Sequence, residues 1–183
     1  MEKKIIKNTG SYFTPDKNGF IINPCSINLI QPEFKDALEL SVEHAKKHLG
    51  DNLHSIYLRG SIAKGTAVKN ISDIDLYIIT EDKETETGWK ETSEKEICNR
   101  YTFIRGIEFH LETTENVLSR KGEQFLLQTQ SVKIFGKDLN LPQSSFKIGK
   151  ESYAHIFFIE KDIKDFYKYI SEEPDEEITD VCS

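Results

Sequence analysis

The chain has 183 residues and a formal net charge of −7, and its 37% hydrophobic residues include 11 Phe and 7 Tyr. This length and apolar content suit one domain with a buried core, or one domain and part of a second. The acidic balance argues against broad binding to nucleic acid, which needs a basic surface. No apolar run is long enough to cross a membrane, and the first residues, MEKKIIKNTGSYF, lack the apolar core of a secretory signal. The three cysteines lie too far apart for a metal-binding motif, so free thiols and a cytoplasmic location are expected.

The N-terminal part predicts an extended segment followed by a helix. Residues 11–30 are extended, and the DKNG sequence at residues 16–19 has the composition of a turn. Between Pro32 and Gly50, apolar residues recur at helical spacing and predict an amphipathic helix. The positions expected to face the core are Phe34, Ala37, Leu38, Ser41, Ala45 and Leu49.

The rest of the chain alternates strands with helices, which is typical of an α/β or α+β sheet domain. The predicted strands cover residues 54–60, 73–80, 101–112 and 131–135. The predicted helices lie within residues 81–99 and over residues 113–130 and 151–171. In the third strand one face is apolar and the other is polar. The apolar face holds Phe103, Ile107, Phe109 and Leu111, and the polar face holds Thr102, Glu108, His110 and Glu112.

Two carboxylates share one face of the second predicted strand. Asp73 and Asp75 are separated by one residue, so their backbones lie roughly 6–7 Å apart on the same side. Two such groups raise each other's pKa unless a cation lies between them. A divalent metal supplies that cation, and magnesium prefers a few carboxylates together with substrate phosphates.

The Gly60-Ser61 corner ends the preceding strand and is expected to open a short helical turn. Glycine lets a phosphate approach the backbone, and free N–H groups together with the Ser61 hydroxyl are suitable donors. A phosphate cradle and a metal-binding aspartate pair, joined by a short connection, indicate a site for a nucleoside triphosphate (NTP).

The stretch YLRGSIAKGTAVKNISDIDLYII resembles the signature of the DNA polymerase beta-like nucleotidyltransferase superfamily, in particular its small bacterial aminoglycoside and minimal nucleotidyltransferase members. The shared features are Gly-Ser, a spacer of 11 residues, and Asp-x-Asp between apolar residues. The family also has a third carboxylate on a neighbouring strand, and Ile107-Glu108-Phe109 matches it. The resemblance covers roughly residues 30–140, and Lys64 stands where many members have arginine.

The resemblance implies a mixed, twisted β-sheet flanked by helices. It also implies a metal-dependent transfer of a nucleoside monophosphate (NMP) from an NTP such as ATP to an acceptor hydroxyl, with release of pyrophosphate. Asp73, Asp75 and Glu108 would bind two Mg²⁺ ions, or Mn²⁺, and Glu108 would also take the proton of the acceptor hydroxyl. The residues implied to bind the nucleotide phosphates are Gly60, Ser61, Lys64 and Thr66.

Several of these residues have plainer interpretations. Glu112 shares the polar face with Glu108, but its place near a helix start favours a solvated or capping acid. His110 is either a neighbour of the active site or a structural histidine. Lys64 either binds a phosphate or is solvated, and Arg59, just before the glycine corner, is interpreted as a structural ion-pair partner.

The acceptor is not specified by the motif. The acidic balance favours a cationic small molecule, such as an aminoglycoside, or a protein over a polymeric nucleic acid. The alternative is an antitoxin-type minimal nucleotidyltransferase that binds and nucleotidylates a partner protein, and a catalytically silent binding module is a third hypothesis. The expected organisation is an N-terminal extended segment or hairpin (residues 1–30), a catalytic domain (31–140) and a C-terminal helical segment (141–183). A short helix expected after Pro174 predicts a further helical domain or a homodimer.

Overall fold

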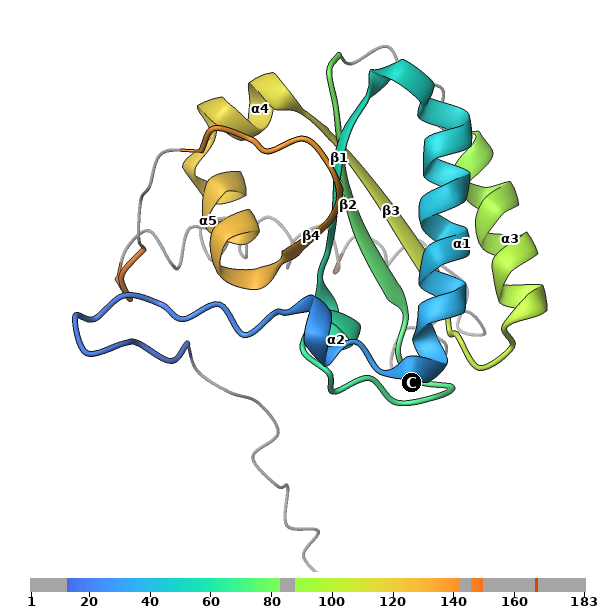
Figure 1. The fold of residues 1–183 in the computed structure, drawn as a ribbon, viewed down its shortest axis with the longest axis horizontal. Helices are drawn as coiled ribbons and strands as arrows, with labels where there is room; N and C mark the ends of the chain where they lie inside the picture. The colour runs from blue at the N-terminus through green and yellow to red at the C-terminus, as the bar shows by residue number, and fades with distance from the viewer. Residues whose placement is uncertain (1–12, 83–87, 142–145, 150–166, 168–183) are drawn as a thin grey trace, which may run out of the picture.

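A computed structural model describes residues 13–82, 88–141, 146–149 and 167 (Figure 1). The helices and strands alternate over most of this length, and two of the helices (η) are short 3-10 helices. In chain order the elements are η1 (Ile27–Leu29), α1 (Pro32–Leu49), η2 (Gly50–Asn52), β1 (Leu53–Leu58), α2 (Gly60–Ala63), β2 (Ile74–Thr80), α3 (Trp89–Arg100), β3 (Ile107–Thr113), α4 (Thr114–Ser119), α5 (Lys121–Gln130) and β4 (Val132–Gly136).

The four strands form one mixed sheet in the order β3-β2-β1-β4. Strand β1 pairs antiparallel with β2 and with β4, whereas β2 and β3 are parallel and are joined through α3. Strands β1 and β2 are therefore central, and β3 and β4 are the edges among the described residues. This architecture confirms the predicted α/β fold with a mixed sheet between helices.

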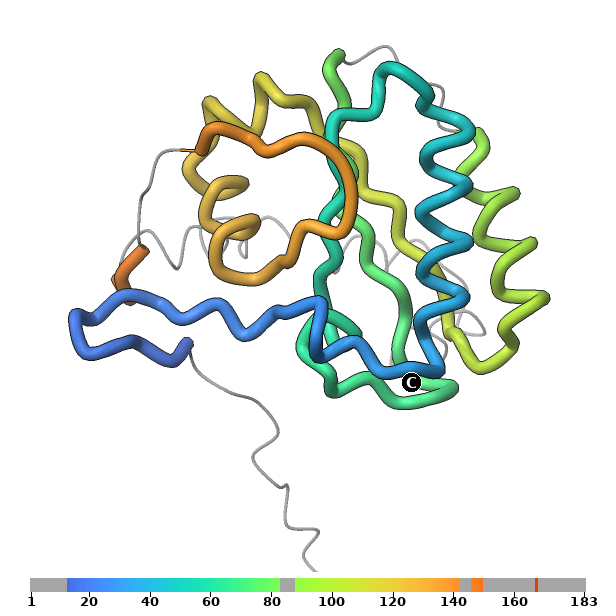
Figure 2. The backbone as a smooth tube through the Cα atoms, viewed as in Figure 1, coloured from blue at the N-terminus to red at the C-terminus, as the bar shows by residue number. Residues whose placement is uncertain are grey.

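Helices cover both faces of the sheet, and each face has its own hydrophobic cluster. Helices α1 and α3 lie side by side on one face, and α4 and α5 lie on the other (Figures 1 and 2). The larger cluster packs apolar residues of α1 and α3 against alternate residues of β1, β2 and β3. The smaller cluster joins the sheet to α4 and α5 through Tyr57, Tyr77, Ile79, Val117 and Leu127.

Helix α1 forms where the spacing of apolar residues predicts it. Pro32 occupies its first turn, three basic residues lie in its last turn, and Gly50 ends it with a φ of +50°. Proline is suited to the first turn and glycine to the end of a helix, and the basic residues complement the helix dipole. All six positions expected to face the core are buried: Phe34, Ala37, Leu38, Ser41, Ala45 and Leu49.

The third strand is shorter than predicted. Strand β3 begins at Ile107 rather than at residue 101. The preceding residues form a turn, with Ile104 N–H donating to the Tyr101 carbonyl (2.9 Å), and the Phe103 carbonyl accepts from Asn70 N–H (2.7 Å). These backbone groups bond to the turn itself and to the connection between α2 and β2, so residues 101–104 form a turn instead of the start of the strand. The second strand likewise begins one residue later than predicted, at Ile74, so Asp73 precedes it.

Two helices replace the single helix predicted over residues 113–130. Thr113 caps α4, and its side-chain hydroxyl accepts from Asn116 N–H (3.2 Å). The chain leaves helical conformation at Arg120 (φ −111°, ψ 113°) before α5 begins. The side-chain amide of Gln124 donates to the carbonyls of Val117 (3.2 Å) and Leu118 (2.7 Å), which are left without helical partners by the break.

The N-terminal described segment turns back on itself near Asp16, as predicted. Gly19 N–H donates to the Asp16 carbonyl (3.0 Å), and Phe20 forms an isolated bridge with Lys147, so that two distant segments lie side by side (Figure 2). Apart from Tyr167, the helix expected over residues 151–171 lies outside the described residues, as does all of the short helix expected after Pro174. Within the described ranges, no helix is long and apolar enough to cross a bilayer.

Candidate active site

Three charged residues form a row across three neighbouring strands. Asp75 of β2 pairs in register with Glu108 of β3. On its other side, the β1–β2 register continues past Leu58, and Arg59 N–H donates to the Asp75 carbonyl (3.0 Å). Residues paired directly across strands have side chains on the same face of the sheet. The row Arg59–Asp75–Glu108 therefore lies on one face, and we call it the charged row.

The next row along the same face is aromatic and is covered by helices. It consists of Tyr57, Tyr77 and His110, which are paired in register. The Tyr77 and His110 rings lie 4.9 Å apart, and the Tyr77 hydroxyl donates to Glu123 of α5 (2.6 Å). Burial, and then the Glu123 carboxylate, raise the pKa of Tyr77 far above its usual value. Helices α4 and α5 thus cover the sheet from this row onward.

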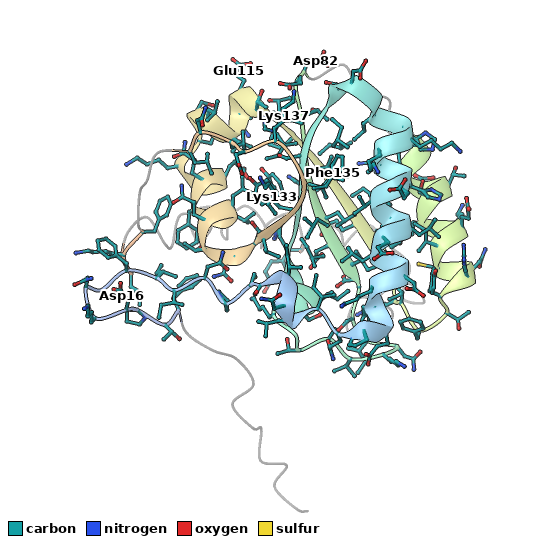
Figure 3. All side chains as sticks on the ribbon, in the orientation of Figure 1. Asp16, Asp82, Glu115, Lys133, Phe135 and Lys137 are labelled. Atoms are coloured by element: carbon teal, nitrogen blue, oxygen red, sulfur yellow. The ribbon has the colours of Figure 1, made fainter. Side chains whose placement is uncertain are left out.

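The charged row lies at the end of the sheet beside α2. Asp82 and Glu115 mark the opposite end (Figure 3). Glu108 is exposed and Asp75 is half-buried. The face that α4 and α5 cover is therefore accessible at the charged row, where a ligand can reach two carboxylates from neighbouring strands.

Gly60 allows the turn after β1 to pack directly against Asp75. Its φ is +70°, and a Cβ atom at this position would lie 2.1 Å from Oδ2 of Asp75. Both the left-handed backbone and the close approach require the absence of a side chain. The glycine of the Gly-Ser motif thus shapes the carboxylate site as well as the turn.

Hydrogen bonds tie the 11-residue spacer back onto the glycine corner. The Ser61 hydroxyl donates to Oγ of Ser72 (2.9 Å), which also accepts from Val68 N–H (2.9 Å). Thr66 N–H and its hydroxyl donate to the Ser61 carbonyl (2.9 and 3.4 Å). These bonds fix the residue directly before Asp73. Ser72 carries no motif of its own, and its position directly before Asp73 is the only signal in the sequence that points to it.

The negative charges of the carboxylates affect one another. The pKa of Asp75 is raised to about 6 by burial first, then by the charge of Asp73 and by hydrogen bonding and charge interaction with Glu108, while Arg59 opposes the rise. Asp73 and Glu108 thus both lie near enough to Asp75 for their charges to affect it. Their mutual repulsion is the property that a bound cation would relieve.

The carboxylates of the described site do not by themselves form a complete metal site. In the described part of the chain, no group of three or more His, Cys, Asp or Glu side chains is already gathered closely enough to hold a metal ion. Asp75 and Glu108 instead lie next to each other across the β2–β3 pairing, beside the exposed Asp73. Oxygen ligands in this small number suit Mg²⁺, which usually completes its coordination with water and substrate phosphates.

Glu112, the other acid on this strand, belongs to the start of α4. Its carboxylate accepts from Thr113 N–H (3.0 Å) and from the Asn116 side chain (2.5 Å), and it lies 3.6 Å from the Arg120 guanidinium. Burial alone would raise the pKa of Glu112, but these hydrogen bonds and the positive charges of Arg120 and His110 lower it. Its partners are therefore internal, whereas Glu108 remains exposed.

A groove of about 510 Å³ runs along β3 and includes Glu108 of the charged row. Helix α3 forms its second wall, where Lys90 donates to the Phe109 carbonyl (3.3 Å) and Glu94 accepts from Ile107 N–H (3.2 Å). The lining residues are Lys90, Glu91, Glu94, Ile107, Glu108, Phe109, His110 and Leu111. Three of the charged side chains in this groove are acidic and one is basic.

The raised pKa of Asp75 predicts a pH-dependent stability of the metal-free protein. Because the folded-state pKa (about 6) exceeds the ordinary value of 3.8, folding favours protonated Asp75. This stabilisation is complete below the unfolded-state value and is lost as the pH rises through about 6. We expect metal-free Asp75→Asn to be more stable than the wild type at about pH 8 and equally stable at about pH 4, measured by thermal unfolding in EDTA. A wild type that is the more stable of the two at the higher pH would contradict the prediction.

Comparison with known proteins identifies a family. A family model described as the nucleotidyltransferase domain matches residues 42–136. The spectinomycin adenyltransferase AAD(9) from Enterococcus faecialis, solved with ATP and spectinomycin, is 19% identical with a TM-score of 0.44. That match covers 60% of this chain and 60% of that chain, so the chain spans only part of the length of the adenyltransferase. No curated protein matches the chain.

Two further solved structures contain toxin–antitoxin proteins. A toxin-antitoxin structure with AMP-PNP is 17% identical, with a TM-score of 0.41, and the match covers 84% of this chain and 100% of that one. A structure of a tri-AMPylated Shewanella oneidensis HEPN toxin in complex with MNT antitoxin is 16% identical, with a TM-score of 0.33. This match covers 82% of this chain and 97% of that one.

The family match coincides with the sheet and the site. It begins within α1 and ends with β4, so it includes every strand of the sheet and the whole charged row. It also covers just over half of the 183 residues. Motif, fold and family match agree, and the chain belongs to the nucleotidyltransferase domain family.

Proposed function

We propose that this protein transfers an NMP group from an NTP to an acceptor hydroxyl and releases pyrophosphate. The observation that carries the proposal is the charged row, in which Asp75 and Glu108 are paired in register beside Asp73 at an accessible end of the sheet. Magnesium, when bound, would neutralise the triphosphate and polarise the phosphorus that is attacked. Asp73, Asp75 and Glu108 are the residues that would hold it, and Mn²⁺ would serve as a substitute.

The other residues of the site have roles that follow from their positions. Gly60, Ser61, Lys64 and Thr66 lie on the turn beside Asp75 and would bind the phosphate tail. Glu108 would accept the proton of the acceptor hydroxyl, because it is exposed and lines the groove along β3. The protein thus acts by positioning the reactants and by balancing charge.

The acceptor is proposed to enter through the groove along β3. Glu91, Glu94 and Glu108 line this groove together with one lysine, Lys90, whose amine is bonded to the Phe109 carbonyl. This charge favours a cationic small molecule. A protein acceptor is the second candidate, because β3 is an edge strand of the described sheet, and an extended segment can pair with such an edge.

A transfer assay tests the proposed function. The protein is incubated with each of the four NTPs, labelled at the α-phosphate, together with Mg²⁺ and a panel of acceptors. The panel contains aminoglycosides, tRNA and hydroxyl-bearing proteins. We expect the label to appear on a cationic small molecule, with one pyrophosphate released per transfer. The Asp75→Asn variant is the negative control and should transfer no label. A protein that neither binds an NTP with Mg²⁺ or Mn²⁺ nor releases pyrophosphate with any acceptor would rule the proposal out.

The two glutamates of β3 should respond differently to substitution. Glu108→Gln removes the proposed base and a metal ligand and should reduce transfer by about 10²- to 10⁴-fold, while NTP binding survives in part. Glu112→Gln should leave transfer nearly unchanged but weaken the start of α4, lowering the free energy of unfolding by roughly 1 kcal/mol. Turnover and denaturant unfolding of both variants measure this contrast. The opposite pattern of activities would make Glu112 the functional acid.

A further inference from the structure

Arg59 is the third member of the charged row, and its side chain has no bonded partner in the described part of the chain. It directly follows β1 and is the cross-strand neighbour of Asp75. The residue is half-buried, yet no hydrogen bond or ion pair involves its guanidinium among the described residues. The earlier interpretation of Arg59 as a structural ion-pair partner is therefore not supported there.

A half-buried guanidinium without acceptors is suited to an anionic ligand. Arginine presents five N–H donors in a planar fork that matches phosphate oxygens, and leaving such donors without partners is unfavourable. Arg59 directly precedes the short helix α2, and Lys64 directly follows it. Two basic residues thus flank α2 at the Arg59 end of the row, and two carboxylates lie at the other positions.

The order of the charged row predicts which part of the nucleotide Arg59 binds. In phosphoryl-type transfer, the attacking oxygen and the leaving oxygen lie on opposite sides of the phosphorus, roughly in line. If Glu108 takes the acceptor proton, it marks the side of attack. Arg59 lies two strands away from Glu108, about 10 Å at the backbone by strand spacing, with Asp75 between them. Arg59 is therefore on the side from which the leaving group departs.

The geometry points to Arg59 as the residue that binds the pyrophosphate end of the NTP and stabilises pyrophosphate as it leaves. This inference rests on the proposed function. In the step, the acceptor oxygen bonds to the α-phosphorus and its proton goes to the Glu108 carboxylate. The bond from the α-phosphorus to the bridging oxygen breaks, and its electron pair stays on pyrophosphate, where the guanidinium balances the new charge.

Binding measurements on Arg59 variants test this assignment. Affinities are measured by calorimetry with Mg²⁺ for the NTP that the wild type binds most tightly, for its monophosphate and for inorganic pyrophosphate. We expect Arg59→Gln to weaken NTP and pyrophosphate binding by about 10- to 100-fold and monophosphate binding by less than about twofold. Arg59→Lys should fall between these limits, because lysine keeps the charge but not the fork.

The matched control is Arg100→Gln, which removes a surface guanidinium that lies over the Tyr101 ring at the end of α3. It should bind all three ligands as the wild type does. An equal loss of affinity for NTP and for monophosphate would mean that Arg59 acts only through its neighbour Asp75, and this would overturn the inference. Unchanged pyrophosphate binding would overturn it as well. If circular dichroism shows Arg59→Gln to be unfolded, Arg59→Lys decides: a selective loss of pyrophosphate affinity supports the assignment, and unchanged affinity overturns it.

The outcomes also separate this inference from the proposed function. A wild type that binds no NTP and transfers nothing contradicts the proposed function itself. A wild type that transfers NMP, beside an Arg59→Gln variant that still binds NTP and pyrophosphate normally, contradicts only the role of Arg59.

Discussion

Asp75→Asn should abolish nucleotide transfer while leaving the protein folded. Asp75 is the middle residue of the charged row, and it lies against Gly60 and is paired in register with Glu108. Its loss removes one of the two carboxylates that are paired across strands, and we expect transfer to fall by at least about 10²- to 10³-fold, as for the loss of one strong electrostatic stabiliser. Asparagine is nearly isosteric, so the sheet should persist. Turnover with labelled NTP and far-ultraviolet circular dichroism measure the two effects.

A control variant separates the site from a general effect of charge. Asp51→Asn changes the same functional group on the exposed 3-10 helix η2 before β1. It should transfer at the wild-type rate. Undiminished transfer by Asp75→Asn would exclude this carboxylate from the active site, whatever the behaviour of Glu108.

Gly60→Ala should inactivate the protein more than it destabilises it. The added Cβ would lie 2.1 Å from Oδ2 of Asp75, and that carboxylate can turn away because it is the free end of a side chain. The main cost to stability is then the positive φ of +70°, which should lower the free energy of unfolding by about 1–3 kcal/mol. Transfer should fall by about 10²-fold or more, because a catalytic group displaced by roughly 1 Å can have that effect.

Gly19→Ala is the matched control for backbone strain. Gly19 has a similar φ of +85°, but nothing lies within 4 Å of its added Cβ. Its unfolding free energy should fall by an amount comparable to that of Gly60→Ala, without loss of transfer. Thermal unfolding and turnover of both variants give the comparison. If the two variants lost activity equally, the close approach to Asp75 would not be the cause.

Local patterns predicted much of the fold and of the site. The spacing of apolar residues alone predicted α1 and its buried face, because one helix face follows directly from the sequence period. The resemblance carried by the Gly-Ser and Asp-x-Asp motif implied a third carboxylate, Glu108, on a neighbouring strand, and the register of β2 and β3 places Glu108 beside Asp75. These features depend on residues that are close in sequence or on one strong motif.

The features that sequence did not predict depend on contacts between distant segments. The alternation over residues 101–106 suggested a strand, but Phe103 is instead held by the Phe34 ring of α1 (5.6 Å) in a turn. The placement of Arg59 beside Asp75 requires the pairing register of β1 and β2, which a shift of one residue would reverse. No period in the sequence fixes that register.

The division of the charged row between inner and edge strands has a consequence for evolvability. Asp75 lies on β2, a central strand with hydrogen-bond ladders on both sides, where most neighbouring residues are fully buried. The groove is formed by β3, a border of the described sheet, and by the solvent side of α3, where Glu91 is exposed. Substitution of an exposed groove residue such as Glu91 therefore disturbs few core contacts, whereas substitution of the buried Ile107 or Phe109, or of the residues around Asp75, disturbs many. Under the proposed function, directed evolution at the exposed groove positions of α3 would change acceptor preference while Asp75 and Glu108, and with them the nucleotide chemistry, stay the same.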